Sequence, residues 1–245
     1  PNELTMDGQE IGDFCEDFGL DGPVPNADMD NSDPRYDPLG NQVMLLQEAI
    51  ALDREVRAAG IIHNAATYDA SLKVTLSGTG QYSDFANSDP VSGILNALEQ
   101  PLMRPTDLTC NSEPWTKLRT HPKMVQAIYG SAATSGIVTR QQVAELFELK
   151  RINVGVSRKN VSNRGQAPSL ARIWGKHIAL TYNAPVIDRG TVTFGASFQW
   201  GDRIAGQQSD STIGLRGGIR VRTGESLRER AIAPMAGYFI ENAVA

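Results

Sequence analysis

The 245-residue sequence predicts an α+β fold, and three observations lead to this class. Residues 42–59 carry apolar side chains at the alternating four- and three-residue spacing of a long amphipathic helix. Residues 177–182 and 191–200 instead alternate apolar and polar side chains, as a strand with one buried face does. A chain of this length can bury roughly 70% of its surface as one large domain or two small ones, so it needs no disulfides for stability.

The first 37 residues are strongly acidic. They contain eleven acidic side chains and one arginine, a balance of −10, so the remaining 208 residues carry +5. Such a composition is usual in a solvated tail, but Phe14, Phe18 and Tyr36 argue against full disorder. We interpret residues 1–41 as an extended arm that becomes ordered on a basic surface of its own chain or of a neighbour. Four prolines between residues 21 and 40 are expected to exclude a regular element there.

The predicted helix at residues 42–59 is the element around which we expect the fold to be organised. Its inward face is expected to carry Leu45, Ala49, Leu52 and Val56. Asn41 can cap its start, and Gly60 can end it in the left-handed conformation. Asp53 and Arg57 can pair one turn apart on its flank. The helix is then either an ordinary core-facing element or a spine on which two pieces of sheet and a neighbouring subunit pack.

The other elements follow from caps and periodicity. A strand is expected at 73–76, followed by a helix that Asp89 and Pro90 open, with Ile94, Leu95 and Leu98 inward. A strand at 106–110 and a helix from Ser112 that continues past Pro122 come next. Then follow a helix with a Thr139–Gln142 capping box and a strand at 151–157 with Ile152, Val154 and Val156 on one face. Residues 158–168 are predicted to form a polar loop. The two alternating strands come next, then a glycine-rich strand at 214–224 and a closing strand at 236–240.

No pattern in the sequence predicts catalysis, a cofactor or a metal site. His63, His121 and His177 lack the spacing of metal-binding motifs, and no serine lies in a GxSxG turn. Cys15 and Cys110 are far apart and outside any CxxC pair, so two free thiols are expected. We therefore predict that the protein is not an enzyme; a cytosolic hydrolase or transferase using His177 is the weaker alternative. No apolar run could cross a bilayer, so no membrane partner is expected.

The glycine-rich stretch at 214–222 is the best candidate for an anion site. Glycines let backbone amides approach an anion, and Arg216, Arg220 and Arg222 could pair with phosphate. The stretch lacks the lysine and hydroxyl residue of a P-loop, however, and does not precede a helix. One charged face of a half-buried strand is the simpler interpretation, and a body of only +5 predicts loose, salt-sensitive contact with nucleic acid. The functional signal is therefore expected in protein surfaces.

Residues 89–124, DPVSGILNALEQPLMRPTDLTCNSEPWTKLRTHPKM, combine a helix opened by Asp-Pro, a Pro-Thr turn, a strand ending in Asn and a helix with the pattern PW..L..HP. Four more pieces accompany it: LDREVRAAGI at 52–61, ARIWGKHIALTY at 171–182, TFGASFQW at 193–200 and AGYFIENAV at 236–244. In this combination the sequence resembles the major capsid proteins of tailed phages with the Hong Kong 97 fold, which encapsulin shells share. The resemblance covers about residues 6–244.

The resemblance implies a division of the chain that periodicity alone does not give. Residues 1–41 would be the returning limb of an extended loop with the arm, and residues 42–102 the peripheral domain with its spine helix. Residues 103–208 would be the axial domain, with the loop 183–190 near a five- or six-fold axis. Residues 209–245 would be strands returning to the peripheral domain. The family's N-terminal arm and the outgoing limb of its extended loop would then precede the first residue.

The same resemblance implies a structural protein that assembles into pentamers and hexamers of an icosahedral phage head enclosing double-stranded DNA. Its expected partners are copies of itself, neighbouring capsid proteins, a portal, a decoration protein and packaged DNA without sequence specificity. It would be assembled in the host cytoplasm and reside in the virion. An encapsulin-like compartment shell is the related alternative.

Subunit contacts are expected on the acidic arm, the long helix, the loop at 183–190 and the glycine-rich strand. The candidate residues are Asp13, Glu16, Asp17, Arg54, Arg57, Pro185, Asp188, Arg189, Arg220 and Arg222. Because the arm is acidic and the remainder basic, raising the salt concentration is expected to loosen the contacts between subunits.

Overall fold

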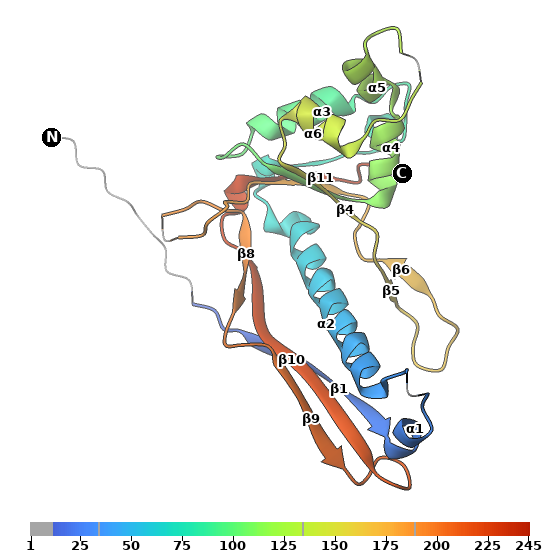
Figure 1. The fold of residues 1–245 in the computed structure, drawn as a ribbon. Helices are drawn as coiled ribbons and strands as arrows, with labels where there is room; N and C mark the ends of the chain where they lie inside the picture. The colour runs from blue at the N-terminus through green and yellow to red at the C-terminus, as the bar shows by residue number, and fades with distance from the viewer. Residues whose placement is uncertain (1–11, 34, 134, 189) are drawn as a thin grey trace, which may run out of the picture. The chain divides into compact units, whose positions relative to one another are not determined.

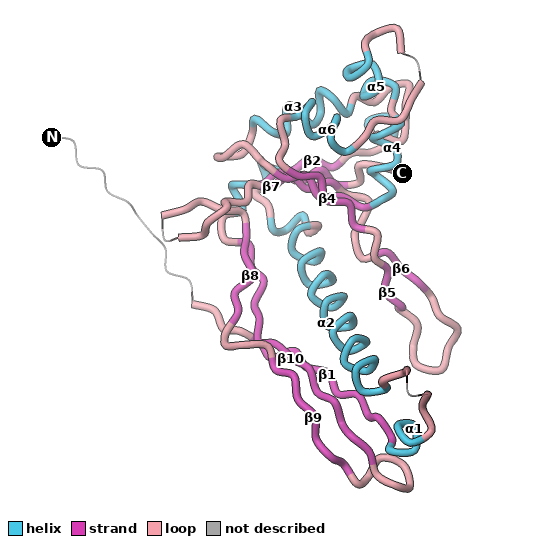
Figure 2. Tube along the Cα trace, in the orientation of Figure 1, coloured by secondary structure: helices cyan, strands magenta, loops and turns pink. Residues whose placement is uncertain are grey.

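The computed structural model describes residues 12–33, 35–133, 135–188 and 190–245, and its separate helical and sheet regions confirm the α+β class (Figures 1 and 2). The chain divides into two compact units. The first comprises residues 1–50 and 197–228, and the second comprises residues 51–196 and 229–245. None of the helices in the described part of the chain is both long and apolar enough to cross a membrane.

The first unit is built on a sheet. Its strands are β1 (Glu16–Pro25), β9 (Ile204–Asp210) and β10 (Gly218–Ala231), and β8 (Gly195–Gln199) also pairs with β10. β10 pairs antiparallel with β1 along the whole length of β1 and, at its other edge, with β9. The first half of helix α2 (Pro38–Ile62) packs on this sheet, because Leu46 forms a buried cluster with Val24 of β1 and Val221 of β10.

The acidic arm therefore contains regular structure, and the prediction that its prolines exclude any element was wrong. Residues 16–25 form β1, and the short helix α1 (Asn26–Asp30) follows. Pro23 and Pro25 are two positions apart, so their nitrogens face the same side of the strand. Among the described residues, β10 is the only strand that pairs with β1, so β1 is an edge strand. Both prolines can therefore place their nitrogens away from β10, as prolines of edge strands do.

Helix α2 confirms the long helix predicted at residues 42–59 but extends beyond both ends. Asp37, rather than Asn41, caps its start, since its carboxylate accepts a hydrogen bond of 3.0 Å from the backbone N–H of Leu39. Gly60 lies within the helix and does not have a positive φ. The buried stripe was also misplaced. It runs through Leu39, Val43, Leu46 and Ile50, whereas Leu45 is 51% exposed and Ala49 is exposed.

The second unit contains a mixed five-stranded sheet with the strand order β2-β11-β7-β3-β4. These strands are β2 (Lys73–Thr75), β11 (Gly237–Glu241), β7 (Ile178–Thr181), β3 (Asp107–Asn111) and β4 (Arg151–Gly155). The two outer pairings, β11 with β2 and β3 with β4, are parallel, and the two pairings of β7 are antiparallel. A separate two-stranded hairpin is formed by β5 (Arg158–Asn160) and β6 (Leu170–Arg172).

Four helices cover one face of this sheet (Figure 1). They are α3 (Pro90–Glu99), α4 (Ser112–Thr120), α5 (Pro122–Tyr129) and α6 (Arg140–Phe147). Ile178 and Leu180 of β7 join the core beneath the helices, whereas Ala179 of the same strand joins a second cluster with Tyr68 and Phe194. The short 3₁₀ segments are Ala65–Thr67, Ala70–Leu72, Gly78–Gly80 and Pro234–Ala236.

The predicted caps of these helices are confirmed. Asp89 accepts hydrogen bonds from the backbone N–H groups of Val91 and Ser92, and Thr139 and Gln142 form the capping box. The single helix predicted from Ser112 is instead two helices, α4 and α5. Its interruption has a local cause, because His121 ends α4 and its side chain accepts a hydrogen bond from the backbone N–H of Lys123 at the start of α5.

Several predicted buried positions are exposed. Leu95 on α3 is 41% exposed and Val156 after β4 is 66% exposed, although their neighbours Ile94 and Val154 pack in or against the core. In the predicted strand 191–200, Phe194 is buried but Phe198 and Trp200 are not. Tyr182 belongs to the cluster of Ala179 rather than to that of Ile178 and Leu180. The predicted loop at 158–168 contains β5 and most of its hairpin.

Candidate functional site

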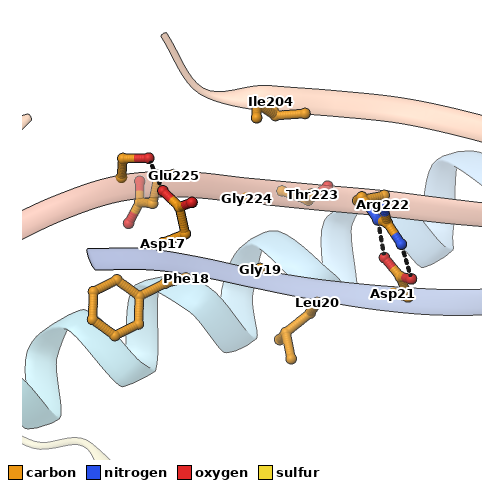
Figure 3. A pocket seen from close by; sticks show the side chains of 11 residues that line it. Asp17, Phe18, Gly19, Leu20, Asp21, Ile204, Arg222, Thr223, Gly224 and Glu225 are labelled. Atoms are coloured by element: carbon orange, nitrogen blue, oxygen red, sulfur yellow. Dashed lines mark hydrogen bonds and ion pairs between the residues drawn. The ribbon is translucent and has the colours of Figure 1, made fainter. Parts of the chain in front are cut away.

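The basic surface on which the acidic arm is ordered is strand β10 of the same chain. Arg222 of β10 donates two hydrogen bonds, each of 2.7 Å, to the two carboxylate oxygens of Asp21 on the adjacent β1 (Figure 3). These hydrogen bonds are the main reason that the pKa of Asp21 lies below its ordinary value, and the charge of Arg222 adds to the effect. The pair is in register across the two strands, so it fixes the alignment of β1 as well as its charge.

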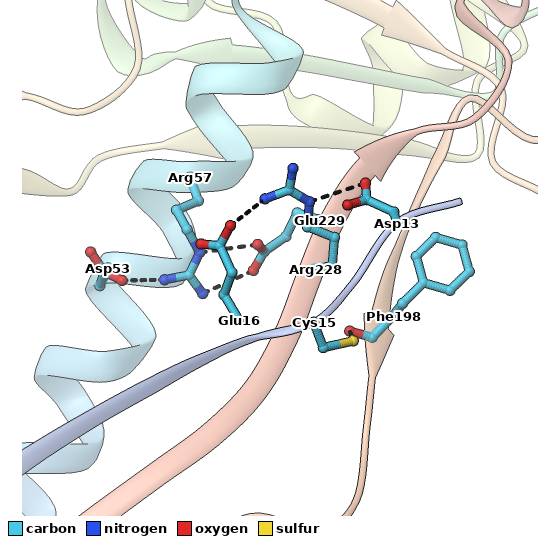
Figure 4. A network of polar contacts seen from close by, with 8 residues as sticks. All are labelled: Asp13, Cys15, Glu16, Asp53, Arg57, Phe198, Arg228 and Glu229. Carbon is cyan, nitrogen blue, oxygen red and sulfur yellow. Dashed lines mark hydrogen bonds and ion pairs between the residues drawn. The ribbon is translucent and has the colours of Figure 1, made fainter. Parts of the chain in front are cut away.

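Two further carboxylates of the arm meet a second arginine of β10. Arg228 donates to Asp13 at 3.2 Å and to Glu16 at 2.9 Å (Figure 4). Asp17, in register with Ser226, accepts a hydrogen bond from the hydroxyl of that serine. The structure therefore brings Asp13, Glu16 and Asp17 together beside β10.

Arg220 is also engaged within the first unit. It donates two hydrogen bonds to one carboxylate oxygen of Asp210, at 3.1 and 2.7 Å, across the turn between β9 and β10. A hydrogen bond from the Thr212 hydroxyl and those from Arg220 lower the pKa of Asp210 to about 2. Arg220 and Arg222 therefore both bind carboxylates of the same chain. They form a charged face of the glycine-rich strand rather than a free anion site.

A groove of about 560 Å³ lies beside the Asp21–Arg222 pair (Figure 3). Gly19 of β1 and Gly224 of β10 are partners in register, so the sheet surface there carries no side chains. A Cβ atom on Gly224 would lie 3.1 Å from the carbonyl oxygen of Phe18, which makes this a close approach of two backbones. Ile204 of β9 lines the groove and is 61% exposed. The groove thus offers backbone and apolar contacts.

The other predicted contact residues lie in the second unit. Arg57 of α2 is paired with Asp53, as predicted, and also donates two hydrogen bonds of 3.0 Å to Glu229 (Figure 4). Burial alone would raise the pKa of Glu229, but the hydrogen bonds and charge of Arg57, with a smaller effect of Arg54, lower it overall. Arg54 and Arg57 therefore belong to a cluster centred on a buried carboxylate.

The loop at residues 183–190 is exposed at its tip. Pro185 and Asp188 are both exposed, and the backbone carbonyl of Asp188 accepts a hydrogen bond from Thr191. Val186 and Ile187, which the sequence interpretation did not single out, are 71% and 52% exposed. Arg189 lies outside the described residues. The loop presents an apolar tip between polar positions.

The histidines occupy structural positions. His121 is buried, and one of its ring nitrogens is 3.0 Å from the hydroxyl of Ser88. His177 accepts a hydrogen bond of 3.0 Å from the backbone N–H of Asn242, and its ring lies 5.7 Å from that of His63. Burial lowers the pKa of His63 to about 4. Among the described residues, no three His, Cys, Asp or Glu side chains are grouped to hold a metal ion.

Exposed apolar side chains are the surface feature that the sequence interpretation missed. Phe14, Trp200 and Ile204 of the first unit are all more than half exposed. Of these three, only Trp200 was predicted to be buried, because the apolar and polar residues alternate in residues 191–200 and such alternation does not distinguish a core strand from a strand whose apolar face is exposed. Such surfaces mark protein contacts in soluble proteins.

The known proteins similar to this chain include capsid proteins of phages. A major capsid protein of Pseudomonas phage JBD67 is 44% identical over 246 aligned residues, which cover 100% of this chain and 79% of the relative. A crystal structure of a phage-related protein from Bordetella bronchiseptica is 24% identical, covers 94% of this chain and 76% of that one, and has a TM-score of 0.75. The capsid of cyanophage P-SCSP1u is 12% identical, with coverage of 98% and 79% and a TM-score of 0.55. No family model matches the sequence.

These similarities bear on both fold and family. The solved structures share the fold of this chain, so the predicted Hong Kong 97-type capsid fold is confirmed. The identity to the Pseudomonas phage protein extends over the whole chain and over most of the relative. The chain therefore belongs to the family of phage major capsid proteins.

Proposed function

We propose that this protein is a structural shell subunit that assembles with copies of itself into the pentamers and hexamers of an icosahedral phage head. The observation that carries the proposal is the 44% identity, over the full chain, to a phage major capsid protein. Exposed apolar side chains on both units support it, because Trp200 and Val186 would be covered in an assembly. The role is structural, with no catalytic step, and the head would enclose double-stranded DNA.

The assignment of domains along the chain is part of the proposal. Residues 42–102 would form the peripheral domain and residues 103–208 the axial domain, with strands from 209–245 returning to the former. Residues 1–41 would lie in the extended loop and arm. The exposed tip at Val186 and Ile187 suits contacts around a five- or six-fold axis, where closed symmetry repeats one modest contact several times.

A phage head and an encapsulin-like compartment differ in what they enclose. We favour the head because the relative at 44% identity is a phage protein. The subunit would then meet neighbouring capsid proteins, a portal and a decoration protein, and contact packaged DNA without reading its sequence. It would be assembled in the host cytoplasm and remain in the virion.

Electron microscopy of the purified protein tests the proposal. We expect closed shells of uniform diameter, with five-fold and six-fold capsomers resolved after averaging. A preparation that stays monomeric at every protein and salt concentration would refute self-assembly. Shells isolated from infected cells and treated with nuclease distinguish the two kinds of content: protected double-stranded DNA supports the head, and a co-purifying enzyme in place of DNA supports the compartment.

A further inference from the structure

The hairpin of β5 and β6 carries positive charge and no negative charge. Residues 158–172, termed here the basic hairpin, contain Arg158, Lys159, Arg164 and Arg172 and no acidic residue. Arg158 and Arg172 are partners in register across the two strands. Like charges directly opposite each other destabilise a strand pair, so the hairpin carries an internal electrostatic repulsion that an external negative charge would relieve.

The basic hairpin is also exposed on both faces. Every residue of β5 is exposed, and Val161 and Leu170 are 54% and 61% exposed although apolar. A two-stranded hairpin with neither face covered is marginally stable in water. The segment is therefore suited to being covered by another surface that offers both apolar contact and negative charge.

The cations of the basic hairpin have no acidic partner in the described part of the chain. Arg158, Lys159 and Arg164 form no ion pair there, and Arg172 donates hydrogen bonds to the neutral side chains of Asn111 and Ser112. This differs from strand β10, where Arg220 already binds a carboxylate. The positive charge of the hairpin thus remains available.

A matching block of negative charge lies in the arm. Residues 28–37, termed here the acidic segment, contain four exposed aspartates and one arginine: Asp28, Asp30, Asp33, Asp37 and Arg35. None of the four aspartates forms an ion pair among the described residues. In the described part of the chain, the carboxylates of Asp33 and Asp37 accept hydrogen bonds from nearby backbone N–H groups, those of Arg35 and Leu39. Asp13, Glu16 and Asp21, by contrast, are already paired with arginines of β10.

Apolar side chains accompany this charge. Tyr36 in the acidic segment is 53% exposed, and Met44 and Leu45, one to two turns into α2, are 61% and 51% exposed. The acidic segment and the start of α2 thus present the same mixture of charge and apolar surface as the basic hairpin, with the opposite sign. Nucleic acid would satisfy the cations of the hairpin but would leave Val161 and Leu170 uncovered.

We propose that the basic hairpin of one copy docks onto the acidic segment and the beginning of α2 of a second copy. The inference rests on the proposed function, because it requires the chain to assemble with itself. Such a contact is heterologous, so repetition around a symmetry axis closes a ring in which every hairpin and every acidic segment is used. It is held by charge at exposed positions, so it weakens as salt rises.

Charge reversal with mixing tests this contact. One variant carries Arg158→Glu and Lys159→Glu, and the other carries Asp28→Lys and Asp30→Lys. Asp37 is left unchanged because it caps α2. We expect each variant alone to lose closed shells by at least about tenfold, the change that about 1.4 kcal/mol produces. A single chain carrying all four changes should assemble again, because every reversed hairpin then faces a reversed segment. An equal mixture of the two variants should restore six-membered rings, in which the variants can alternate, but not five-membered rings, in which an odd number of copies leaves one mismatched contact.

Two controls make the outcome specific. Arg158→Glu places an acid opposite Arg172, so the hairpin itself is strengthened and a loss of shells cannot be assigned to its unfolding. A variant with Lys150→Glu and Arg216→Glu makes the same change in net charge at exposed positions outside both surfaces. We expect it to assemble normally, and a loss of shells as large as that of the hairpin variant would overturn the inference.

The remaining outcomes separate the inference from the proposed function. If the unmodified protein forms no shells, the proposed function fails. If it forms shells and the hairpin variant does so equally well, the inference alone fails. Rescue in a single chain carrying all four changes, with no six-membered rings in the mixture, would assign the contact to one copy and overturn docking between copies. Normal shells that have lost bound DNA would assign the hairpin to nucleic acid instead.

Discussion

The guanidinium of Arg57 and the carboxylate of Glu229 form a two-point ion pair, with two hydrogen bonds of 3.0 Å between residues 172 positions apart. Both side chains are shielded from water, at 20% and 8% exposure. The pair connects α2 to the end of β10 within the second unit. Because a buried carboxylate requires a partner, the stability of this unit depends on the arginine.

Replacing Arg57 by alanine should lower the free energy of unfolding by about 3 kcal/mol, since Glu229 would be left buried and unpaired. Urea titration followed by circular dichroism measures the loss. Arg222→Ala is the matched control, because Arg222 is 62% exposed and solvent screens its pair with Asp21. We expect the control to lose clearly less. Equal losses in the two variants would contradict the role given to burial.

Acidification should destabilise the protein through His63. Its pKa of about 4 lies below the ordinary value of 6.5, so the unfolded chain binds a proton in a range where the folded chain does not. Stability is therefore complete above about pH 6.5 and falls by roughly 3 kcal/mol as the pH decreases to about 4. Urea midpoints measured across this range should show the fall. In His63→Phe the slope between pH 6.5 and 4 should be smaller by the part that His63 contributes, while His121 and His177, whose pKa values burial also lowers, keep their own part. An unchanged slope would exclude His63 as a source.

Alanine at Gly60 and at Gly155 should have opposite effects. Gly60 lies within α2, is exposed and has open space where a Cβ atom would lie, so Gly60→Ala should stabilise the helix by about 0.5–1 kcal/mol. A Cβ atom on Gly155 would overlap the indole of Trp174, whose Nε1 donates a hydrogen bond of 2.6 Å to Glu55. Gly155→Ala should therefore destabilise by about 1–3 kcal/mol and shift the tryptophan fluorescence. Two changes of the same sign would contradict this packing.

The two cysteines should differ in reactivity. Cys110 is completely buried in the second unit, and burial raises the pKa of its thiol to about 12. Cys15 is partly accessible near the start of β1, and its thiol donates to the carbonyl oxygen of Phe198 at 3.7 Å. Titration with a thiol reagent should label one cysteine in the native protein and both in urea. Cys15→Ser should abolish the native signal; labelling that persists would show that Cys110 is accessible.

The sequence predicted the structure reliably where an interaction joins residues that are close in the sequence. The Asp89 cap and the Thr139–Gln142 capping box were predicted because a cap needs only residues two or three positions apart. The buried face of α2 was not predicted. The helix has apolar residues on more than one face, and the choice of Leu46 over Leu45 depends on packing against Val221, which is distant in the sequence.

The predicted contact residues show the same difference between interactions of residues near in the sequence and interactions of distant ones. The excess of acid in the arm and of base elsewhere predicted that the two would meet, but not that Asp21 would pair with Arg222 of its own chain, 201 positions away. Glu229, the partner of Arg57, was missed because a single glutamate carries no pattern. Trp200 was assigned to a buried face, since an exposed apolar position has the same sequence pattern as a core position.

The position of strand β7 between two hydrophobic clusters determines how the second unit unfolds on heating. Ile178 and Leu180 belong to one hydrophobic cluster and Ala179 to the other, so the strand is a wall shared by both. Because each cluster holds β7 in position, one cluster cannot unfold while the other stays folded. The second unit should consequently lose its structure in a single cooperative calorimetric transition, rather than one layer at a time.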